Sequence, residues 1–489
     1  MLGQDTLPAL LRAAAEEYGD HPAYVEGERV VSYAELLRLV EATSEVYGNS
    51  GFCCGDKIVL WGPNSIDWAV AALAVSYAGG VLVPVNSRYV GVEVADIVER
   101  TGAKLVVVHD GFLGRSQWNE LLEARVHDHA DIDRLDHLME SAQRAEGMQH
   151  EDVQPDDVAD ILFTSGTTGR SKGAMSAHRQ TIGVARAWAE LGGVRQDDRY
   201  LVVNPFFHSF GYKIGIVVGL LTGCTLYPVA TFDVEETMRL IESEGITVFP
   251  GAPTLYQSIL AAPTRAEHDL SSLRLAVTGA AVVPVVLIER MREELAIDHV
   301  VTAFGMTEAV VVTMCREGDS AETVATTNGR AIAGMETRIA ENGELLVRGD
   351  YVMLGYLDDP EATREAIDEE GWLHTGDIGS LDEHGNLRIT DRLKDMYISG
   401  GFNVYPAEVE QVLMRMEGVV DVAVVGVPDE RMGEVGKAFV VGSVSPDEVI
   451  AYARENLANF KVPRQVELRE SLPRNLGGKV LKTQLRDGH

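Results

Sequence analysis

The segment DILFTSGTTGRSKG, residues 160–173, indicates both the fold and the ligand class of this chain. The apolar residues 161–163 predict a buried strand, and the glycine and hydroxyl residues that follow predict a loop. Glycines let backbone N–H groups converge on one point, and hydroxyl groups and Lys172 add further donors. These properties favour a polyphosphate-binding loop over a flexible linker, because linkers rarely place a lysine after such a run.

The loop does not match the Walker type of phosphate-binding loop. Gly166 and Gly169 are too close together, and Gly173 follows Lys172 where that motif has the metal-binding Ser or Thr.

The charge of the whole chain limits its partners. Among 489 residues, 42 are basic and 75 are acidic, which gives a net charge of −33. We expect repulsion of nucleic acid and of anionic membrane surfaces, although solubility alone also explains such a charge. An anionic ligand such as ATP therefore requires a few basic groups and a metal ion concentrated at one place.

Cysteine content and the N-terminus favour a cytoplasmic protein. Four cysteines show no metal-binding spacing, which fits a reducing compartment, and the first residues lack the features of a signal peptide. The longest apolar stretch, residues 68–85, contains two glycines and a proline, so it predicts a helix followed by a strand rather than a membrane span.

Apolar runs alternate with helix-length patterns through most of the chain, which predicts stacked βαβ units in a large layered α/β domain. Strands are expected near residues 57–61, 81–85, 104–108, 161–164, 199–203, 225–229, 246–250, 274–279 and 299–305. Residues 126–157 read as surface loop and helix, and a helix is expected from about residue 178, directly after the phosphate loop. Ligands collect at the carboxyl ends of strands in such sheets.

Beyond about residue 330 the pattern changes. Short alternating segments separated by Gly and Asp predict a small antiparallel or barrel subdomain. The last hundred residues have strand–helix alternation of their own and predict a separate, smaller α+β domain. We expect an N-terminal domain at residues 1–391, a hinge at 392–394 and a mobile C-terminal domain at 395–489.

Eight strings occur in an order that resembles the adenylate-forming superfamily of acyl-CoA synthetases, luciferases and adenylation domains. They are TSGTTGRSKG (164–173), NPFFHSFG (204–211), TGAA (278–281), FGMTE (304–308), GELLVRG (343–349), GWLHTGD (371–377), DRLKD (391–395) and PRNLGGK (473–479). The resemblance covers essentially the whole chain. It implies activation of a carboxylic acid as acyl-AMP, with ATP, Mg²⁺ and CoA as the other reactants and cofactors.

The resemblance also implies which residues bind ATP and AMP. They are Thr164, Ser165, Thr167, Thr168, Lys172, Gly279, Ala280, Ala281, Phe304, Gly305, Asp377 and Arg392. Phe304 stands where the family usually has Tyr, so it can stack on adenine but lacks a hydroxyl contact.

Four residues are implied as catalytic: Thr307, Glu308, His208 and Lys479. Glu308 would hold Mg²⁺, and Thr307 would donate to the α-phosphate, where charge develops. In isolation Glu308 would be read as an acid at a helix N-terminus, but Gly305 and the preceding strand favour metal binding. His208 could equally be a core histidine, although its matching string favours a gate that orients the carboxylate. Lys479 would bridge the carboxylate and the α-phosphate.

The ribose contacts have structural alternatives as well. Asp377 can accept from both ribose hydroxyls, or it can be a turn residue before a strand. Arg392 would support the ribose or phosphate, or form a surface salt bridge.

The implied mechanism has two half-reactions separated by a domain rotation. Lys479 acts in the first, and the C-terminal domain then rotates about Lys394. The backbone of Gly400 and Gly401 would contribute to the thiol channel in the second. Residue 398 is Ile, where luciferases and some ligases carry a second lysine, so no lysine role is transferred to it.

The acyl pocket is expected to include Phe207, His208, Phe210, Lys213 and Met306. Lys213 is either a surface lysine or a donor to a distal oxo or acid group of the substrate. NPFFHSFGYK and residues 391–413 are particularly similar to actinobacterial ligases for the bicyclic propanoate left from steroid rings C and D.

Alternatives are a medium- or long-chain fatty acyl-CoA ligase and an enzyme that loads a carrier protein. The expected partners are the carboxylic acid and CoA, without nucleic acid or stable membrane insertion, and a homodimer is compatible with the sequence.

Overall fold

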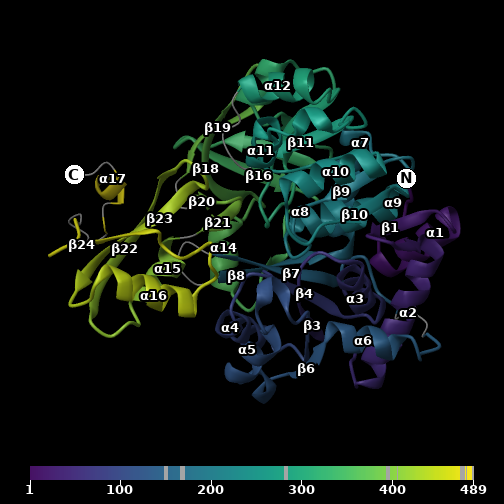
Figure 1. The fold of residues 1–489 in the computed structure, drawn as a ribbon, viewed down its shortest axis with the longest axis horizontal. Coiled ribbons are helices and arrows are strands. Elements are labelled where there is room, and N and C mark those ends of the chain that lie inside the picture. The colour runs from purple at the N-terminus through teal and green to yellow at the C-terminus, as the bar shows by residue number, and fades with distance from the viewer. Residues whose placement is uncertain are drawn as a thin grey trace.

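The computed structural model describes residues 1–147, 152–165, 171–279, 285–392, 397–404, 406–473, 480 and 482–486. Figure 1 displays a large N-terminal domain and a small C-terminal domain at one end of the long axis. The predicted fold class is confirmed. The expected hinge residue Lys394 lies outside the described residues, so the predicted domain boundaries stay predictions.

A seven-stranded sheet forms the lower layer in Figure 1. Its central strands are parallel and buried, because their helices cover both faces. The strands, in spatial order, are β17 (Gly355–Tyr356), β8 (Ser171–Ala177), β7 (Val158–Ser165), β4 (Val81–Val85), β3 (Lys57–Trp61), β5 (Leu105–Val108) and β6 (Asp131–Arg134). The helices between them are α3 (Ile66–Tyr77), α4 (Gly91–Thr101), α5 (Gln117–Glu123) and α6 (Leu135–Ala142).

A second layer has two four-stranded groups linked by isolated bridges from Val248 to both. The first group is β2 (Arg29–Ser32), β1 (Pro22–Glu26), β10 (Thr225–Pro228) and β9 (Arg199–Val202), and the second is β11 (Leu275–Gly279), β12 (His299–Phe304), β13 (Thr313–Met314) and β14 (Arg330–Ala331). Its helices are α1 (Leu7–Tyr18), α2 (Tyr33–Asn49), α7 (His178–Gly192), α8 (Ser209–Gly211), a π-helix (Tyr212–Val217), α9 (Val218–Thr222), α10 (Val234–Glu244), α11 (Pro253–Ala261), α12 (Val285–Glu294) and α13 (Ala321–Thr326).

The two layers share one hydrophobic core. Helix α3 is buried on nearly all sides, as its apolar sequence requires, and contributes Trp68 and Leu73 to this core. The predicted helix and strand within residues 68–85 are therefore confirmed. No described helix is long and apolar enough to cross a membrane.

The predicted antiparallel subdomain is a four-stranded sheet of β15 (Met335–Ile339), β16 (Glu344–Gly349), β18 (Leu373–Leu381) and β19 (Leu387–Arg392), with α14 (Pro360–Ala366) nearby in the chain. The C-terminal domain contains β20 (Tyr397–Ser399), β21 (Phe402–Val404), β22 (Val419–Asp429), β23 (Gly433–Gly442) and β24 (Gln465–Leu468), with α15 (Pro406–Leu413), α16 (Pro446–Asn456) and α17 (Lys482–Arg486). It has its own apolar core, which includes Val424, Val440 and Val449.

Three predictions of local structure were wrong. Residues 171–177 form β8, antiparallel to β7, rather than the end of a loop before a helix. Residues 131–134 form the edge strand β6. Residues 246–250 form only single bridges through Val248. Each of these segments takes its structure from pairing with another strand, β8 with β7 and β17, β6 with β5, and Val248 with β9 and β11, which a local pattern does not report.

Candidate active site

The predicted phosphate loop, of which Thr167 and Thr168 lie outside the described residues, belongs to a β-hairpin. In the hairpin, Thr164 lies directly opposite Lys172, and Ser165 lies opposite Ser171. Arg100, on α4, donates to the backbone oxygen of Ser171 at 2.5 Å and to its Oγ at 3.1 Å. These contacts hold Ser171 at the loop end of the hairpin, so the strand register decides where Lys172 presents its ammonium group.

Tyr356 contacts both Lys172 and Glu308, and this residue was not among the predicted site residues. The Lys172 ammonium group lies 5.0 Å from the centre of the Tyr356 ring. The Tyr356 hydroxyl donates to Oε1 of Glu308 at 2.8 Å. Tyr356 lies in the two-residue strand β17, paired with β8, which is too short for a hydrophobic period to reveal.

Glu308 lies in a tight turn, so the alternative of an acid at a helix N-terminus is wrong. Met306 O accepts from Ala309 N at 3.0 Å within this turn. A Cβ atom on Gly305 would come within 1.7 Å of Val310 O, so only glycine fits there. Glu308 is 8% exposed. A nearly buried carboxylate that accepts from Tyr356 is fixed in direction before any ligand arrives.

The predicted adenine-binding residues meet at the carboxyl ends of β11 and β12. Gly279 lies opposite Ala303 in this parallel pair, and Phe304 ends β12. Ala280 and Ala281 lie outside the described residues. Gly279 and Phe304 are therefore brought together at the edge where α/β sheets bind ligands.

His208 follows β9 and is oriented by its own backbone. Its Nδ1 accepts from the Phe210 N–H group at 3.2 Å, so the neutral ring carries its proton on Nε2. The His208 side chain is exposed to solvent, although many protein atoms lie around the ring. Desolvation lowers the pKa of His208 to about 4. At neutral pH, Nε2–H is thus a donor, which suits an orienting role better than that of a base.

Asn64 holds the segment before His208 and was missed by sequence reasoning. Its Oδ1 accepts from the N–H group of Phe206 at 2.7 Å. Its Nδ2 donates to Val202 O at 3.1 Å and Asn204 O at 3.0 Å. Asn64 comes from the loop between β3 and α3, so only the tertiary fold brings it here.

Lys213 is buried, which contradicts its interpretation as a surface lysine. Its Nζ lies 3.0 Å from Asp160 Oδ1 and donates to Ser176 Oγ at 2.8 Å. Thr181 Oγ1 donates to the other Asp160 oxygen at 2.7 Å. Burial lowers the pKa of Lys213, while the Asp160 carboxylate favours the charged form. The pair connects the π-helix behind His208 and Phe210 to the hairpin that carries Lys172.

Asp377 lies within β18, not in a turn before it, so its alternative interpretation as a turn residue is wrong. It lies opposite Arg392 of β19 in the antiparallel register. The two predicted ribose-binding positions are therefore neighbours, although they are separated by 14 residues of chain (392 − 377 − 1).

The remaining predicted residues lie in the turns and the C-terminal domain. Thr307 and Met306 belong to the Glu308 turn, and Phe207 precedes His208 in the segment fixed by Asn64. Gly400 and Gly401 form the tip of the β20–β21 hairpin with φ values of +58° and +84°. Lys479 lies outside the described residues.

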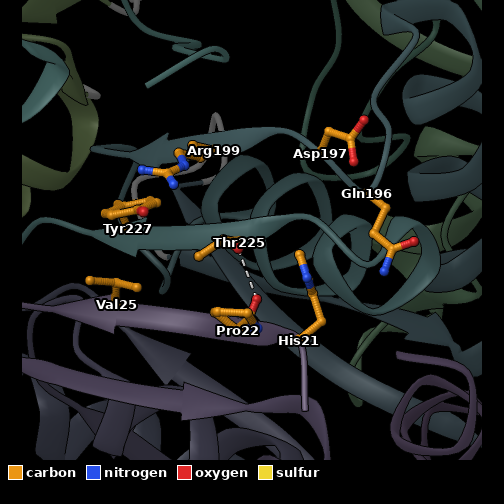
Figure 2. A pocket seen from close by; sticks show the side chains of 8 residues that line it. All are labelled: His21, Pro22, Val25, Gln196, Asp197, Arg199, Thr225 and Tyr227. Atoms are coloured by element: carbon orange, nitrogen blue, oxygen red, sulfur yellow. Dashed lines mark hydrogen bonds between the residues drawn. The ribbon is translucent and has the colours of Figure 1, made fainter. Parts of the chain in front are cut away.

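A separate pocket of about 330 Å³ opens at the opposite edge of the second layer (Figure 2). It is lined by residues of β1 and β10, by His21 before β1, and by residues at or before the start of β9 such as Arg199, whereas His208 follows the end of β9. It is therefore not part of the candidate active site.

Among the described residues, no group of three or more His, Cys, Asp or Glu side chains is arranged to hold a metal ion. Mg²⁺ in nucleotide sites is commonly held by one or two carboxylates together with phosphate oxygens and water. The oxygen donor of Glu308 fits this hard cation.

Comparison with known proteins defines the class. Residues 11–357 match the family of AMP-binding enzymes, and residues 408–479 match the C-terminal domain of AMP-binding enzymes. The chain belongs to this family, and the predicted superfamily is confirmed.

A closer relationship narrows the class to CoA ligases. The chain is 52% identical to 3-[(3aS,4S,7aS)-7a-methyl-1,5-dioxo-octahydro-1H-inden-4-yl]propanoyl:CoA ligase from Rhodococcus jostii (strain RHA1), over 99% of this chain and 98% of the relative. The predicted similarity to ligases for steroid-derived propanoates is thereby confirmed.

Two solved structures share the fold over nearly their full length. One is a double mutant of o-succinylbenzoate CoA synthetase (MenE) from Bacillus subtilis bound with its product analogue OSB-NCoA. It has a TM-score of 0.89, 28% identity, and 98% coverage of each chain. The other is ATP-bound MatB from Rhodopseudomonas palustris, with a TM-score of 0.74, 29% identity, and 99% coverage of each chain.

Proposed function

We propose that this protein is an ATP-dependent acyl-CoA ligase whose acid substrate is a bicyclic, oxo-bearing propanoate of the kind left by steroid ring degradation. The observation that carries the substrate class is the 52% identity, over 99% of the chain, to the Rhodococcus jostii ligase named for such an acid. The conjunction of Lys172, Tyr356 and Glu308 supports the nucleotide chemistry.

ATP is bound with its terminal phosphates at the β7–β8 hairpin. Lys172 and the Thr164 hydroxyl neutralise and hydrogen-bond phosphate oxygens there. Glu308 would hold Mg²⁺, which screens the negative charge of the phosphates when bound. Tyr356 fixes the Glu308 carboxylate through the 2.8 Å hydrogen bond. The adenine lies against Gly279 and Phe304, and the ribose hydroxyls bind Asp377.

In the first half-reaction, a carboxylate oxygen of the acid attacks the α-phosphorus of ATP. The new O–P bond forms as the bond between the α-phosphorus and the bridging oxygen breaks, and pyrophosphate leaves. Thr307 donates to the α-phosphate oxygens, and Lys479 offsets the repulsion between the two anions. His208 Nε2–H orients the acid without changing its own protonation.

In the second half-reaction, the CoA sulfur attacks the carbonyl carbon of the acyl-adenylate. The C–S bond forms, the C–O bond to phosphate breaks, and AMP leaves while the thiol proton passes to solvent. The C-terminal domain turns between the two steps about Lys394, so the Gly400–Gly401 turn replaces Lys479 at the site.

The acid pocket is built on the segment after β9. Phe207, Phe210 and Met306 supply apolar surface, which suits a fused-ring acid. Lys213 Nζ is engaged by Asp160 and Ser176, so its main role is to hold the π-helix under this pocket. A direct contact between Lys213 and a substrate ketone stays a prediction.

The test is pyrophosphate release across a panel of acids, with CoA-dependent AMP formation measured in parallel. We expect the dioxo-octahydroindenyl propanoate to give the highest kcat/KM among linear fatty acids, aryl acids and ring propanoates. A preference for a medium- or long-chain fatty acid would show that the proposed substrate class is wrong and that the protein is a fatty acyl-CoA ligase. Acyl transfer only to a carrier protein, with none to CoA, would refute the ligase assignment.

A further inference from the structure

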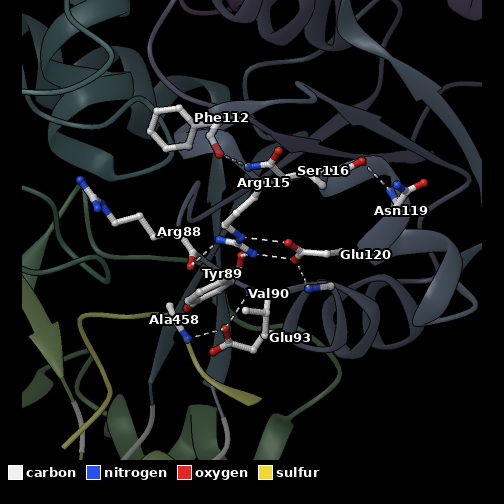
Figure 3. A network of polar contacts seen from close by, with 12 residues as sticks. Arg88, Tyr89, Val90, Glu93, Phe112, Arg115, Ser116, Asn119, Glu120 and Ala458 are labelled. Carbon is white, nitrogen blue, oxygen red and sulfur yellow. Dashed lines mark hydrogen bonds and ion pairs between the residues drawn. The ribbon is translucent and has the colours of Figure 1, made fainter. Parts of the chain in front are cut away.

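A buried lysine of the C-terminal domain is paired with a carboxylate of the N-terminal domain. Lys461 Nζ lies 2.8 Å from Oε1 of Glu93 on α4, and 2.5 Å from Oε1 of Glu408 on α15. Only 3% of the Lys461 side chain is exposed. Glu93 Oε2 also accepts from the Ala458 N–H group at 3.2 Å, a second contact between the domains that Figure 3 includes.

Aromatic contacts surround this ion pair. The Lys461 ammonium group lies 3.9 Å from the centre of the Tyr89 ring. On the same surface, the Arg88 guanidinium group lies 5.3 Å from the centre of the Phe402 ring, which stacks on Phe460 at 4.6 Å. Removal of one partner from a buried ion pair costs more than removal from a surface pair, because the other charge stays buried without its partner.

On the N-terminal side of the contact, hydrogen bonds from neighbouring residues hold the segment from Tyr89 to Glu93 in place (Figure 3). Arg115 donates to Tyr89 O at 2.9 Å and to both oxygens of Glu120. Glu120 also accepts from the Gly91 N–H group at 3.0 Å, at the start of α4. Glu93 itself accepts from the Val90 N–H group at 3.0 Å. Glu93 is therefore presented to the C-terminal domain in one fixed position.

This contact exists in one particular arrangement of the two domains. In Figure 1, β20 and β21 face the N-terminal domain, while α17, which follows Lys479 in the chain, lies near the far end. That is the arrangement proposed above for the second half-reaction, in which the Gly400–Gly401 turn lies at the active site. The similarity is also higher to the synthetase bound with a CoA product analogue, TM-score 0.89, than to the ATP-bound one, 0.74, at almost equal identity and coverage.

We propose that Glu93 and Lys461 are positioning residues for the thioester-forming half-reaction, because their ion pair holds the C-terminal domain in the orientation that receives CoA. The inference rests on the proposed function. Lys461 and Ala458 move with the C-terminal domain, so both contacts to Glu93 break when Lys479 is brought to the site. Glu408 moves together with Lys461, so that ion pair persists in both orientations.

Glu93→Gln tests the proposal, because glutamine keeps the size of the side chain and can still accept from Val90 N–H. The first readout is the ratio of the two half-reactions: ATP–pyrophosphate exchange with the dioxo-octahydroindenyl propanoate, and CoA consumption of the preformed acyl-adenylate. We expect the second rate to fall about tenfold relative to the first, the factor for losing one charge-assisted hydrogen bond. Glu408→Gln is the matched control and should leave the ratio unchanged.

The second readout needs no acid substrate. Spin labels on E123C and E455C, two exposed positions on α5 and α16, report the distance between the domains after Cys53 and Cys54 are replaced by Ser. In the other domain orientation the two labels lie at a different distance. Glu93→Gln should raise the population of molecules with that distance about tenfold, and Glu408→Gln should not. Equal loss of both half-reactions, or unchanged distances, would overturn the proposal. If the wild-type protein activates no acid, the proposed function fails, and the distances still decide on the ion pair.

Discussion

Replacement of Lys213 by methionine would leave the Asp160 carboxylate buried without its cation. The two side chains are 1% and 0% exposed and lie 3.0 Å apart. Removal of one partner from such a pair costs about 3–5 kcal/mol of folding free energy, because a buried charge remains unpaired. Thr181 still donates to Asp160, so we expect a value of about 3 kcal/mol for Lys213→Met.

A double-mutant cycle with Asp160→Asn separates the contribution of the ion pair to the free energy of unfolding from the effect of lost packing. In Lys213→Met/Asp160→Asn no charge is left, and the new amide can still accept from Thr181. The double variant should therefore lose only about 1–2 kcal/mol, less than either single variant.

Guanidinium unfolding followed by tryptophan fluorescence is a suitable assay, because Trp188 lies beside this region, 6.1 Å from the Phe210 ring centre. Lys104→Met is the matched control. It breaks a 2.6 Å pair with Asp56, but the Lys104 side chain is 52% exposed, so its effect should be much smaller. Single losses that add in the double variant, or a Lys213→Met effect no larger than the control, would refute the reasoning.

Three other substitutions test separate parts of the site and the fold. Tyr356→Phe removes the donor to Glu308, and we expect ATP–pyrophosphate exchange to require more Mg²⁺ and to fall about tenfold; an unchanged Mg²⁺ dependence would contradict the role of Tyr356. Lys479→Ala should slow adenylation by about 10²–10³ and largely spare CoA transfer to preformed acyl-AMP; equal loss of both would contradict domain alternation. His178→Gln tests pH dependence. Burial lowers the pKa of His178 to about 4 from 6.5, so the unfolded state binds the proton first and stability is lost as pH falls from about 6.5 to about 4. Between pH 6.5 and 5 the wild-type protein should lose about 2 kcal/mol of stability in this way. The unfolding midpoint of the variant, measured at both pH values, should not show this loss.

The parallel strands were predictable because their burial on both faces leaves continuous apolar runs. Residues 57–61 and 81–85 form strands with the predicted bounds. Strand β8 was not predicted, since its small residues Gly173, Ala174 and Ser176 have no clear alternation. It is a strand because β7 and β17 pair with it on either side.

The candidate site was predictable where a residue belongs to a contiguous string. Asp377 and Arg392 come from two such strings and lie opposite each other in the antiparallel register, while the roles predicted for them stay predictions. Tyr356 and Asn64 could not be found in this way, because each acts through one hydrogen-bonding group that reaches a segment distant in the chain. The burial of Lys213 was also hidden, since its partner Asp160 lies 53 positions earlier (213 − 160).

The hairpin that carries Lys172 has a consequence for how this site tolerates changes in chain length. Successive side chains of a strand point to opposite faces, so deletion of one residue between positions 173 and 177 would slip β8 against β7 and β17. Lys172 would then no longer lie opposite Thr164, and its side chain would point away from Tyr356. Ser171 would lose its hydrogen bonds with Arg100. A residue added between positions 166 and 170 changes no pairing in either strand. Length variation among homologues should therefore be absent from residues 171–177.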